Sequence, residues 1–166
     1  MTAQAVQIGP ARRSDVAAMA TMSRDLIERG LGWRWTAPRI EAHRRREDVL
    51  AVQASVAGYL AGFAIMQFGA TRAHLLLLAV GAERRRLGIG RRLLQWLEEC
   101  ADVAGIHSIV LELRARNAGA LAFYRALGYE ELRVLPGYYL GRESAIRMMR
   151  ILRLPDAPPP WTPPRA

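Results

Sequence analysis

The segment AVGAERRRLGIGRRLL, residues 79–94, joins an apolar run that ends at Val80 to an amphipathic helical pattern. Between the two lie a short basic loop and two glycines, Gly88 and Gly90. The first amides of a helix have no partner within the helix, and the helix dipole makes them electropositive. Glycine lets a phosphate approach such amides without an intervening Cβ. Five arginines surround the turn: Arg84, Arg85, Arg86, Arg91 and Arg92. The segment therefore predicts a strand–turn–helix unit whose turn binds a diphosphate.

Two common nucleotide-binding motifs do not fit this turn. A Walker loop requires a Gly-Lys-Ser/Thr sequence, and none follows the glycines. A dinucleotide-binding fingerprint requires more glycines than the two present here. The predicted diphosphate site therefore belongs to another class of protein.

Outward from this unit, helical and strand patterns alternate along the chain, which predicts a layered α/β domain. Ser14 and Asp15 are expected to cap the first helix, and Asn117 and Gly128 to bound the last. Strands are expected at 6–9, 49–54, 59–68, 72–80, 106–113, 129–134 and 145–152, and helices at 14–29, from about 38, at 88–104 and at 117–127.

The spacing Arg85-x-x-Gly88-x-Gly90 resembles the acetyl-CoA signature of the GNAT superfamily of N-acetyltransferases. The segment LELRARNAGALAFYRALGYEE, residues 111–131, looks like the second half of a GNAT core. The segment PGYYLGRESAIRMM, residues 136–149, resembles the subgroup that acetylates the N-termini of ribosomal proteins. The resemblance covers residues 72–152 well and the first 70 residues only in element order. It implies a mixed, splayed central sheet of about seven strands flanked by about four helices, with acetyl-CoA as acetyl donor.

The resemblance also assigns residues to the donor. Backbone groups at the end of the strand before the loop would pair with the pantetheine arm, and main-chain groups of the turn would bind the diphosphate. The cofactor-binding residues that it implies are Leu78, Ala79, Val80, Arg85, Arg86, Leu87, Gly88, Ile89, Gly90, Arg91, Asn117 and Tyr124.

Amine acetylation needs a proton acceptor, because an alkyl amine is largely protonated at neutral pH. Glu112 is the candidate base, since a carboxylate within the apolar strand SIVLELR is costly unless it is paired or functional. Burial is expected to raise its pKa. An ion pair with a neighbouring arginine is the alternative explanation.

Tyr124 follows Asn117 by two helical turns, so both lie on one helix face. The resemblance makes Tyr124 the general acid for the departing thiolate; an ordinary phenol has a pKa near 10 and a thiol one near 8.5. A core aromatic and a plain N-cap are the alternatives. Cys100 lies at helical core spacing beside Glu98 and Glu99, which disfavours a thiolate, so direct transfer is expected.

The acceptor is less well defined by the sequence. By resemblance, Tyr138 and Tyr139 line the acceptor groove, with Trp33 and Trp35 on its other wall; the tryptophans are equally explained as lids over the core. A peptide N-terminus is favoured, and a small-metabolite amine stays open. Two other classes are alternatives: a CoA-binding module without catalysis, and a nucleic-acid-binding module that uses residues 44–46 and the arginines near Gly88. The sequence disfavours a nucleic-acid partner, since it shows no aromatic–basic interleaving or helix-turn-helix pattern and a solvated helix end better explains residues 44–46.

Length and composition limit the possible number of domains, the location and the partners of the protein. The chain has 166 residues, one cysteine and a formal net charge of +9, all of its basic residues being arginine. These features predict one domain at 1–153, a cytoplasmic location, anionic partners and no disulfide. We also expect no membrane partner, since the apolar runs are too short, no metal, since the three histidines are dispersed, and a Pro-rich mobile tail at 154–166. A homodimer stays open.

Overall fold

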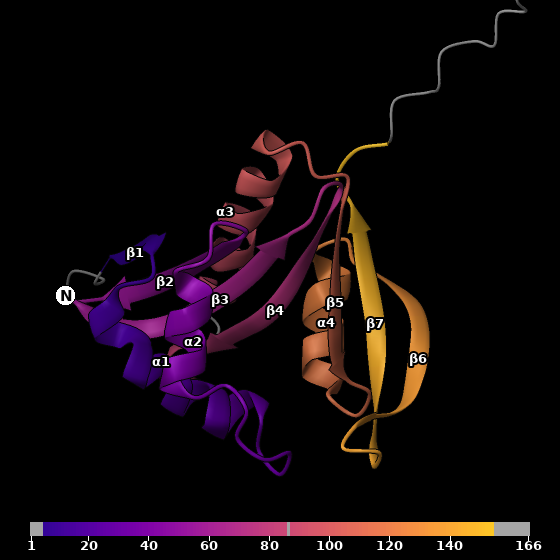
Figure 1. Cartoon of the computed structure of the whole chain (residues 1–166), viewed down its shortest axis with the longest axis horizontal. Coiled ribbons are helices and arrows are strands. Elements are labelled where there is room, and N and C mark those ends of the chain that lie inside the picture. Colours follow the sequence, from indigo (N-terminus) through magenta and orange to yellow (C-terminus); the bar gives the residue numbers. More distant parts are fainter. Residues whose placement is uncertain (1–4, 86, 155–166) are drawn as a thin grey trace, which may run out of the picture.

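The computed structural model describes residues 5–85 and 87–154. Within these residues seven strands form one sheet, in the order β1-β2-β3-β4-β5-β7-β6 (Figure 1). Every neighbouring pair is antiparallel except β4 and β5, which are parallel. The strands are β1 Val6–Pro10, β2 Val49–Val56, β3 Tyr59–Phe68, β4 Arg72–Val80, β5 Ser108–Arg114, β6 Glu130–Tyr139 and β7 Glu143–Ile151. The predicted mixed sheet of about seven strands is confirmed.

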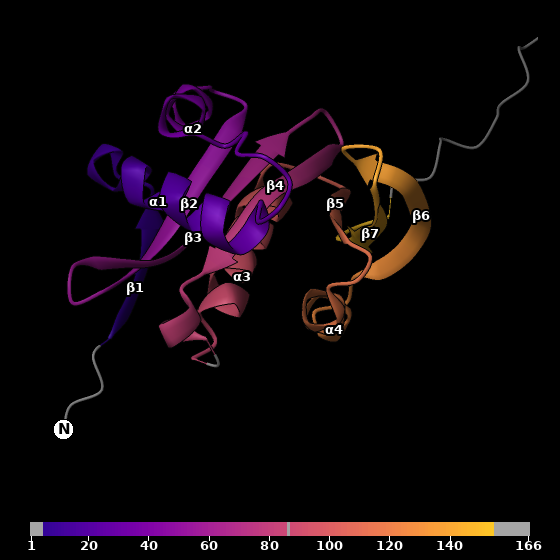
Figure 2. The same cartoon turned by 90° about the horizontal axis from the view of Figure 1, so that it is seen from below.

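Helices cover both faces of this sheet, as Figure 2 shows. On one face, α1 (Val16–Met22) and α2 (Ala37–Arg44) pack over β2 to β4; α1 continues as one π-helical turn, η2 (Ser23–Ile27). On the other face lie α3 (Ile89–Val103) and α4 (Ala118–Ala126), with α4 over β5 and β7. Two short 3₁₀ helices, η1 (Arg13–Asp15) and η3 (Ala82–Arg84), complete the described elements. The four α-helices match the predicted number.

Two hydrophobic cores result from this arrangement. The α3 and α4 side buries the larger one, in which Leu93, Leu94 and Leu97 of α3 lie against the sheet. The α1 and α2 side buries Met19, Ile40 and other side chains against β2 to β4. Among the described residues this second core includes none from β5, β6 or β7. That face of β5 and β7 carries the paired side chains of Glu112 and Arg147.

A β-bulge in β4 determines which residues face which core. Leu75 pairs with Met66 and Leu77 with Ile65, so Leu76 is an extra residue in β4. Leu75 accordingly belongs to the core under α3, whereas Leu77 belongs to the core under α1 and α2. The bulge reverses the side-chain alternation just where β4 leaves its neighbour β5.

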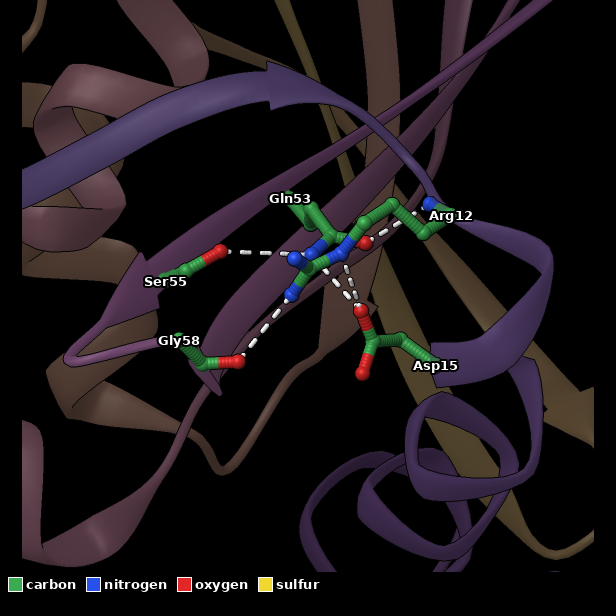
Figure 3. A network of polar contacts seen from close by, with 5 residues as sticks. All are labelled: Arg12, Asp15, Gln53, Ser55 and Gly58. Carbon is green, nitrogen blue, oxygen red and sulfur yellow. Dashed lines mark hydrogen bonds and ion pairs between the residues drawn. The ribbon is translucent and has the colours of Figure 1, made fainter.

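The first helix begins differently from the prediction. Asp15 makes no capping hydrogen bond to the helix, and neither does Ser14. Instead the Asp15 carboxylate accepts hydrogen bonds from Arg12 Nε at 2.7 Å and Gln53 Nε2 at 2.9 Å (Figure 3). These bonds, that from Gln53 foremost, lower the pKa of Asp15. Arg12 also donates to the Gly58 carbonyl, so the network ties the chain after β1 to the β2–β3 hairpin. This tertiary network outweighed the local cap.

Several element boundaries also differ from the predictions. The β6 strand was predicted to end at Val134 but continues through Pro136 to Tyr139. A proline is tolerated there because β6 is the edge strand and its pairing with β7 is irregular between Leu135 and Tyr139. The β5 strand begins at Ser108 rather than at residue 106.

Candidate active site

An open groove lies where β4 and β5 separate. The two strands pair at only three positions, the last being His74 opposite Val110, and then diverge. The backbone edge of β4 that faces β5 is therefore unpaired beyond this point. The groove has a volume of about 1220 Å³, and its walls come from β4, the start of α3, β5, α4, the segment after η2 and the end of β6. Local sequence patterns predicted each strand but not this separation, which the family resemblance implied as a splayed sheet.

The predicted diphosphate turn lines one end of the groove. Gly88 caps α3 at φ +71°, a left-handed conformation that favours glycine, and a Cβ built there meets no atom within 4 Å. The space beside the first amides of α3 is therefore open. Gly90 has a different role, since a Cβ there would lie 3.3 Å from Phe123 of α4. Gly90 lets α3 approach α4, and Gly88 leaves room for a ligand.

The other residues predicted to bind the acetyl donor differ in where they lie. Leu78, Ala79 and Val80 line the groove along β4, and Arg85, Ile89 and Arg91 line it around the turn. Leu87 has an exposed side chain and does not line the groove. Arg86 lies outside the described residues. The open turn, the free edge of β4 and these basic residues together fit a diphosphate joined to a long extended arm.

Asn117 and Tyr124 both line the groove from α4. Asn117 caps the helix as predicted, because its Oδ1 accepts a hydrogen bond from the Ala120 amide at 3.0 Å. Tyr124 is buried between Phe123 and Tyr129, with ring centroids 5.0 and 5.6 Å away. Burial raises the pKa of Tyr124 well above its ordinary value of 10, where the sequence argument had assumed a typical phenol. The hydroxyl therefore stays protonated at neutral pH.

Glu112 lies on the face of β5 that points away from α4, because its neighbours Leu111 and Leu113 belong to the core that contains Tyr124. Its side chain is only 7% exposed and has two partners. Oε1 pairs with Arg147 of β7 at 2.7 Å, and Oε2 lies 2.5 Å from Nε2 of His74 on β4. Glu112 is thus an ion-paired carboxylate, the alternative that the sequence had left open, and it also lines the groove.

The predicted rise in the pKa of Glu112 is wrong. Burial does raise the pKa, but the hydrogen bonds and positive charges of His74 and Arg147 outweigh that effect. The pKa therefore lies below its ordinary value of 4.5. The error arose because the sequence showed an apolar strand around Glu112 but not the partners from β4 and β7.

His74 was missed as a site residue, since the three histidines had been judged only for metal spacing. A signal was available: His74 in RAHLLLLAV and Glu112 in SIVLELR are each a polar residue within an apolar strand. The sequence did not show that these strands are parallel neighbours.

The aromatic residues predicted for the acceptor lie in different environments. Tyr138 and Tyr139, at the end of β6, both line the groove, and their rings pack edge to face. Burial raises the pKa of Tyr139 to about 12. Trp35 also lines the groove and packs against His43 and Arg39. Trp33 is 45% exposed and does not line the groove.

Glu28 organises the segment that carries these tryptophans, a role that the sequence analysis missed. Its buried carboxylate accepts hydrogen bonds from the backbone amides of Arg34 and Trp35 and from the Ser23 hydroxyl. One buried anion thus folds residues 28–35 into a wall of the groove.

Other candidate features lie outside the groove. Cys100 is half-buried on α3 rather than fully buried, because Ala101 occupies the core position instead; burial and then Glu99 raise the pKa of Cys100. In residues 5–85 and 87–154 no three His, Cys, Asp or Glu side chains cluster as a metal site would require. No helix in that part of the chain is long and apolar enough to span a membrane. Arg44 and Arg46 are paired with Glu41 and Asp48.

This fold and groove define a class of enzyme, and sequence comparison identifies the same class. Residues 19–129 match the model of the acetyltransferase (GNAT) family, and the chain belongs to that family. It is an acetyl-CoA-dependent N-acetyltransferase, which transfers the acetyl group to an amine.

Two curated relatives and one crystal structure illustrate the similarity. The chain is 38% identical over 110 residues to the [ribosomal protein bS18]-alanine N-acetyltransferase of Escherichia coli strain K12, covering 64% of this chain and 74% of the relative. It is 28% identical over 151 residues to an N-alpha-acetyltransferase of Sulfurisphaera tokodaii, covering 86% and 90%. The crystal structure of the ribosomal-protein-S18-alanine N-acetyltransferase from E. coli superposes with a TM-score of 0.79 at 29% identity, covering 91% of this chain and 96% of the other.

Proposed function

We propose that this N-acetyltransferase acts on the N-terminal amine of a peptide or protein. Two observations support this acceptor. The relatives named above act on protein N-termini, as their names state. The groove is also lined by the segment that Glu28 organises and by the tyrosines at the end of β6, in addition to Glu112. The second observation carries the proposal, because these walls would give an extended peptide contacts beyond its first residue while its amine reaches Glu112.

The donor would bind along the side of the groove formed by β4 and α3. Leu78, Ala79 and Val80 pair with β3 on one side, and on the free side of β4 their backbone groups would hydrogen-bond to the extended arm of acetyl-CoA, as a missing strand would. Main-chain amides of residues 86–91 would bind its diphosphate with help from the Arg85 charge, and Asn117 would contact the arm from α4. The acyl group would then lie between β5 and α4.

The chemistry that these residues supply is acid–base catalysis. Glu112 would remove the proton from the acceptor ammonium, directly or through water, so that the neutral amine attacks the thioester carbonyl. Tyr124 would donate a hydrogen bond and then its proton to the departing sulfur. Its burial keeps the phenol protonated but also makes it a weaker acid, so the hydrogen bond to the sulfur would come first and the proton would follow only as negative charge develops there. Both side chains line the same groove, Glu112 from β5 and Tyr124 from α4, which supports their joint use.

Direct transfer from donor to amine is favoured over an acetyl-cysteine intermediate. Cys100 does not line the groove, and its raised pKa disfavours the thiolate. Trp35, Tyr138 and Tyr139 would contact the acceptor. Trp33 would contact only the part of a longer acceptor that extends beyond the groove.

A substrate panel tests this function. Thiol release from acetyl-CoA would be measured with peptides of varied N-terminal residue and with small amines that include a polyamine and an aminoglycoside. We expect peptides with a small first residue such as alanine to give the highest kcat/KM. Higher kcat/KM for the small amines would make the protein a metabolite acetyltransferase.

The Glu112→Gln variant should lower kcat at least about a hundredfold while coenzyme A still binds.

Tyr124→Phe tests the proposed acid. We expect kcat to fall about tenfold to a hundredfold with the KM for acetyl-CoA little changed, because the hydroxyl would act mainly in the transition state. A thioester with a better leaving group should restore much of the rate. If the variant loses affinity for acetyl-CoA at unchanged kcat, Tyr124 only positions the donor.

Three more general predictions, on the domain bounds, the cellular location and the oligomeric state, also remain proposals. Residues 1–153 would form the catalytic domain, while the predicted Pro-rich tail lies, beyond Leu154, outside the described residues. A cytoplasmic location would agree with an acceptor of the ribosomal type. Homodimer formation can be measured by light scattering.

A further inference from the structure

Two arginines in the walls of the groove have no role in the reaction described above. Arg34 lies in the segment after η2 and Arg39 lies on α2, and both line the groove. In the part of the chain that the structure describes, neither guanidinium pairs with a carboxylate. Arg114 also lines the groove, but it lies 3.3 Å from the carboxylate of Glu143. Arg34 and Arg39 therefore present positive charge that the described residues do not neutralise.

The donor does not account for these two arginines. They come from the segment and the helix that cover one face of the sheet, whereas α3 lies on the other face (Figure 2). The turn before α3 has arginines of its own, because Arg84, Arg85 and Arg91 line the groove there. The diphosphate of the donor would use the positive charge at the turn. The charge of Arg34 and Arg39 thus lies on the acceptor side.

The carboxylates of the groove already have partners. Its lining residues include two, Glu28 and Glu112. Glu28 accepts hydrogen bonds from two backbone amides of its own segment, and Glu112 is in contact with Arg147 and His74. An acidic acceptor side chain would therefore find guanidinium groups without a competing carboxylate, and a lysine there would meet like charge.

Arg39 is held in a position that suits a carboxylate. Its guanidinium carbon lies 4.6 Å from the centroid of the Trp35 ring. A guanidinium that stacks on an aromatic ring keeps its N–H groups available in its own plane, where a carboxylate binds with two hydrogen bonds. Trp35 is itself fixed, since its amide donates to Glu28 and its ring packs against His43. Such fixation lowers the entropy cost of binding.

Arg34 is near the part of the groove that leads to the proposed base. Burial raises the pKa of Tyr138 and the charge of Glu112 raises it further, whereas the charges of Arg147 and Arg34 oppose this rise. Tyr138 is therefore within electrostatic reach of both Glu112 and Arg34, and all three line the groove. An extended peptide advances about 3.3 Å per residue. With its amine at Glu112, its next few residues would pass these side chains.

We propose that Arg34 and Arg39 select acceptor peptides that carry an acidic side chain shortly after the first residue. The inference rests on the proposed function, because it takes a peptide N-terminus as the acceptor. A small first residue brings the amine to Glu112, and an aspartate or glutamate at one of positions two to four pairs with a guanidinium. A neutral side chain at that position loses the ion pair, and a lysine is repelled.

A set of matched peptides tests this selection. Each begins with alanine and carries aspartate, asparagine or lysine at position two, three or four, with neutral residues elsewhere. At the best position, we expect kcat/KM for the aspartate peptide to exceed that for the lysine peptide about tenfold or more, mainly through KM. The ratio should shrink in about 0.5 M salt, because salt screens charges that solvent can reach.

Charge variants identify the residues responsible. Arg34→Gln combined with Arg39→Gln should bring the ratio of aspartate to lysine peptide close to one without weakening coenzyme A binding. Arg34→Glu should favour the lysine peptide, a reversal that a purely structural role would not produce. Arg133→Gln is the matched control, since Arg133 is exposed on β6 and does not line the groove, and it should keep the wild-type ratio.

The outcomes separate this selection from the peptide function itself. Equal kcat/KM for the aspartate, asparagine and lysine peptides would overturn the selection and leave a peptide N-terminus as the acceptor. A preference for aspartate that survives the combined substitution would overturn the role of the two arginines. Turnover of small amines but of none of the peptides would overturn both proposals.

Discussion

At the scale of single residues, Glu112 is a position for which the sequence allowed two explanations. A carboxylate in an apolar strand suggested either a base or an ion pair, and the structure places it in contact with Arg147 and His74. Removal from water alone would have raised its pKa, but two cationic or polarisable partners lowered it instead. The balance of desolvation and hydrogen bonding therefore determines what this carboxylate can do.

Acid unfolding tests this balance. The pKa of Glu112 is lower in the folded chain than its ordinary value of 4.5, which represents the unfolded chain. Its ionisation therefore stabilises the fold fully above the unfolded value, and this contribution is lost as pH falls through the folded value. Urea unfolding from about pH 7 to about pH 3 should show a smaller loss of stability for Glu112→Gln than for the wild type. Parallel pH curves for both proteins would contradict the assignment.

At the scale of secondary-structure elements, the turn between β4 and α3 combines conformation and space. Gly88 takes a left-handed φ at the start of α3, beside open space, whereas Gly90 is needed because Phe123 lies close. The same local sequence thus contains one glycine for the ligand and one for helix packing. The distinction depends on α4, which comes some thirty residues later in the chain.

Gly88→Ala and Gly58→Ala form a matched pair for testing the turn. Both glycines have positive φ, +71° and +80°, and at both an added Cβ meets nothing within 4 Å. Each substitution should cost about 1 kcal/mol of stability through backbone strain. Only Gly88→Ala should also weaken coenzyme A binding, by about tenfold or 1.4 kcal/mol. Calorimetry and urea unfolding check this, and equal coenzyme A affinity in both variants would exclude the turn as the diphosphate site.

At the scale of the whole molecule, the seven strands form one sheet that is weakly joined between β4 and β5. The strands β4 and β5 share three pairs, and few other contacts cross the groove. One is the hydrogen bond of 2.6 Å from Arg114 of β5 to the Arg29 carbonyl, and another is that between His74 and Glu112. The separation of β4 from β5 leaves backbone groups on that edge of β4 without hydrogen-bond partners in the sheet, and the donor would supply those partners.

Hydrogen exchange should detect that replacement. Coenzyme A at a hundredfold excess over its Kd should stabilise the fold by about 2.7 kcal/mol. Beyond this global effect, those amides of residues 75–80 that point away from β3 should gain local protection, because that edge of β4 is unpaired. The paired strands β2 and β3 serve as the internal reference. Protection that rises equally in all three strands would contradict backbone pairing with the donor.

The sequence alone determined the features that depend on neighbouring residues. The glycine turn before α3, the Asn117 cap and the order of strands and helices all follow from short-range patterns, and the structure contains each of them. The resemblance around residues 72–152 also identified the family, because a ligand-binding turn requires particular residues at fixed spacing. These properties depend on residues that are close together in the chain, so they can be predicted from the sequence.

Tertiary structure alone determined the rest. The bulge at Leu76, the Glu28 contacts and the pairing of His74 with Glu112 all join residues that a local pattern does not connect. Parallel pairing between strands that are far apart in the chain decided which polar side chains meet. Once they met, hydrogen bonds to partners outside β5 reversed the expected direction of the pKa shift of Glu112. Identity and spacing predicted the reaction, while three-dimensional packing set the proton chemistry available to perform it.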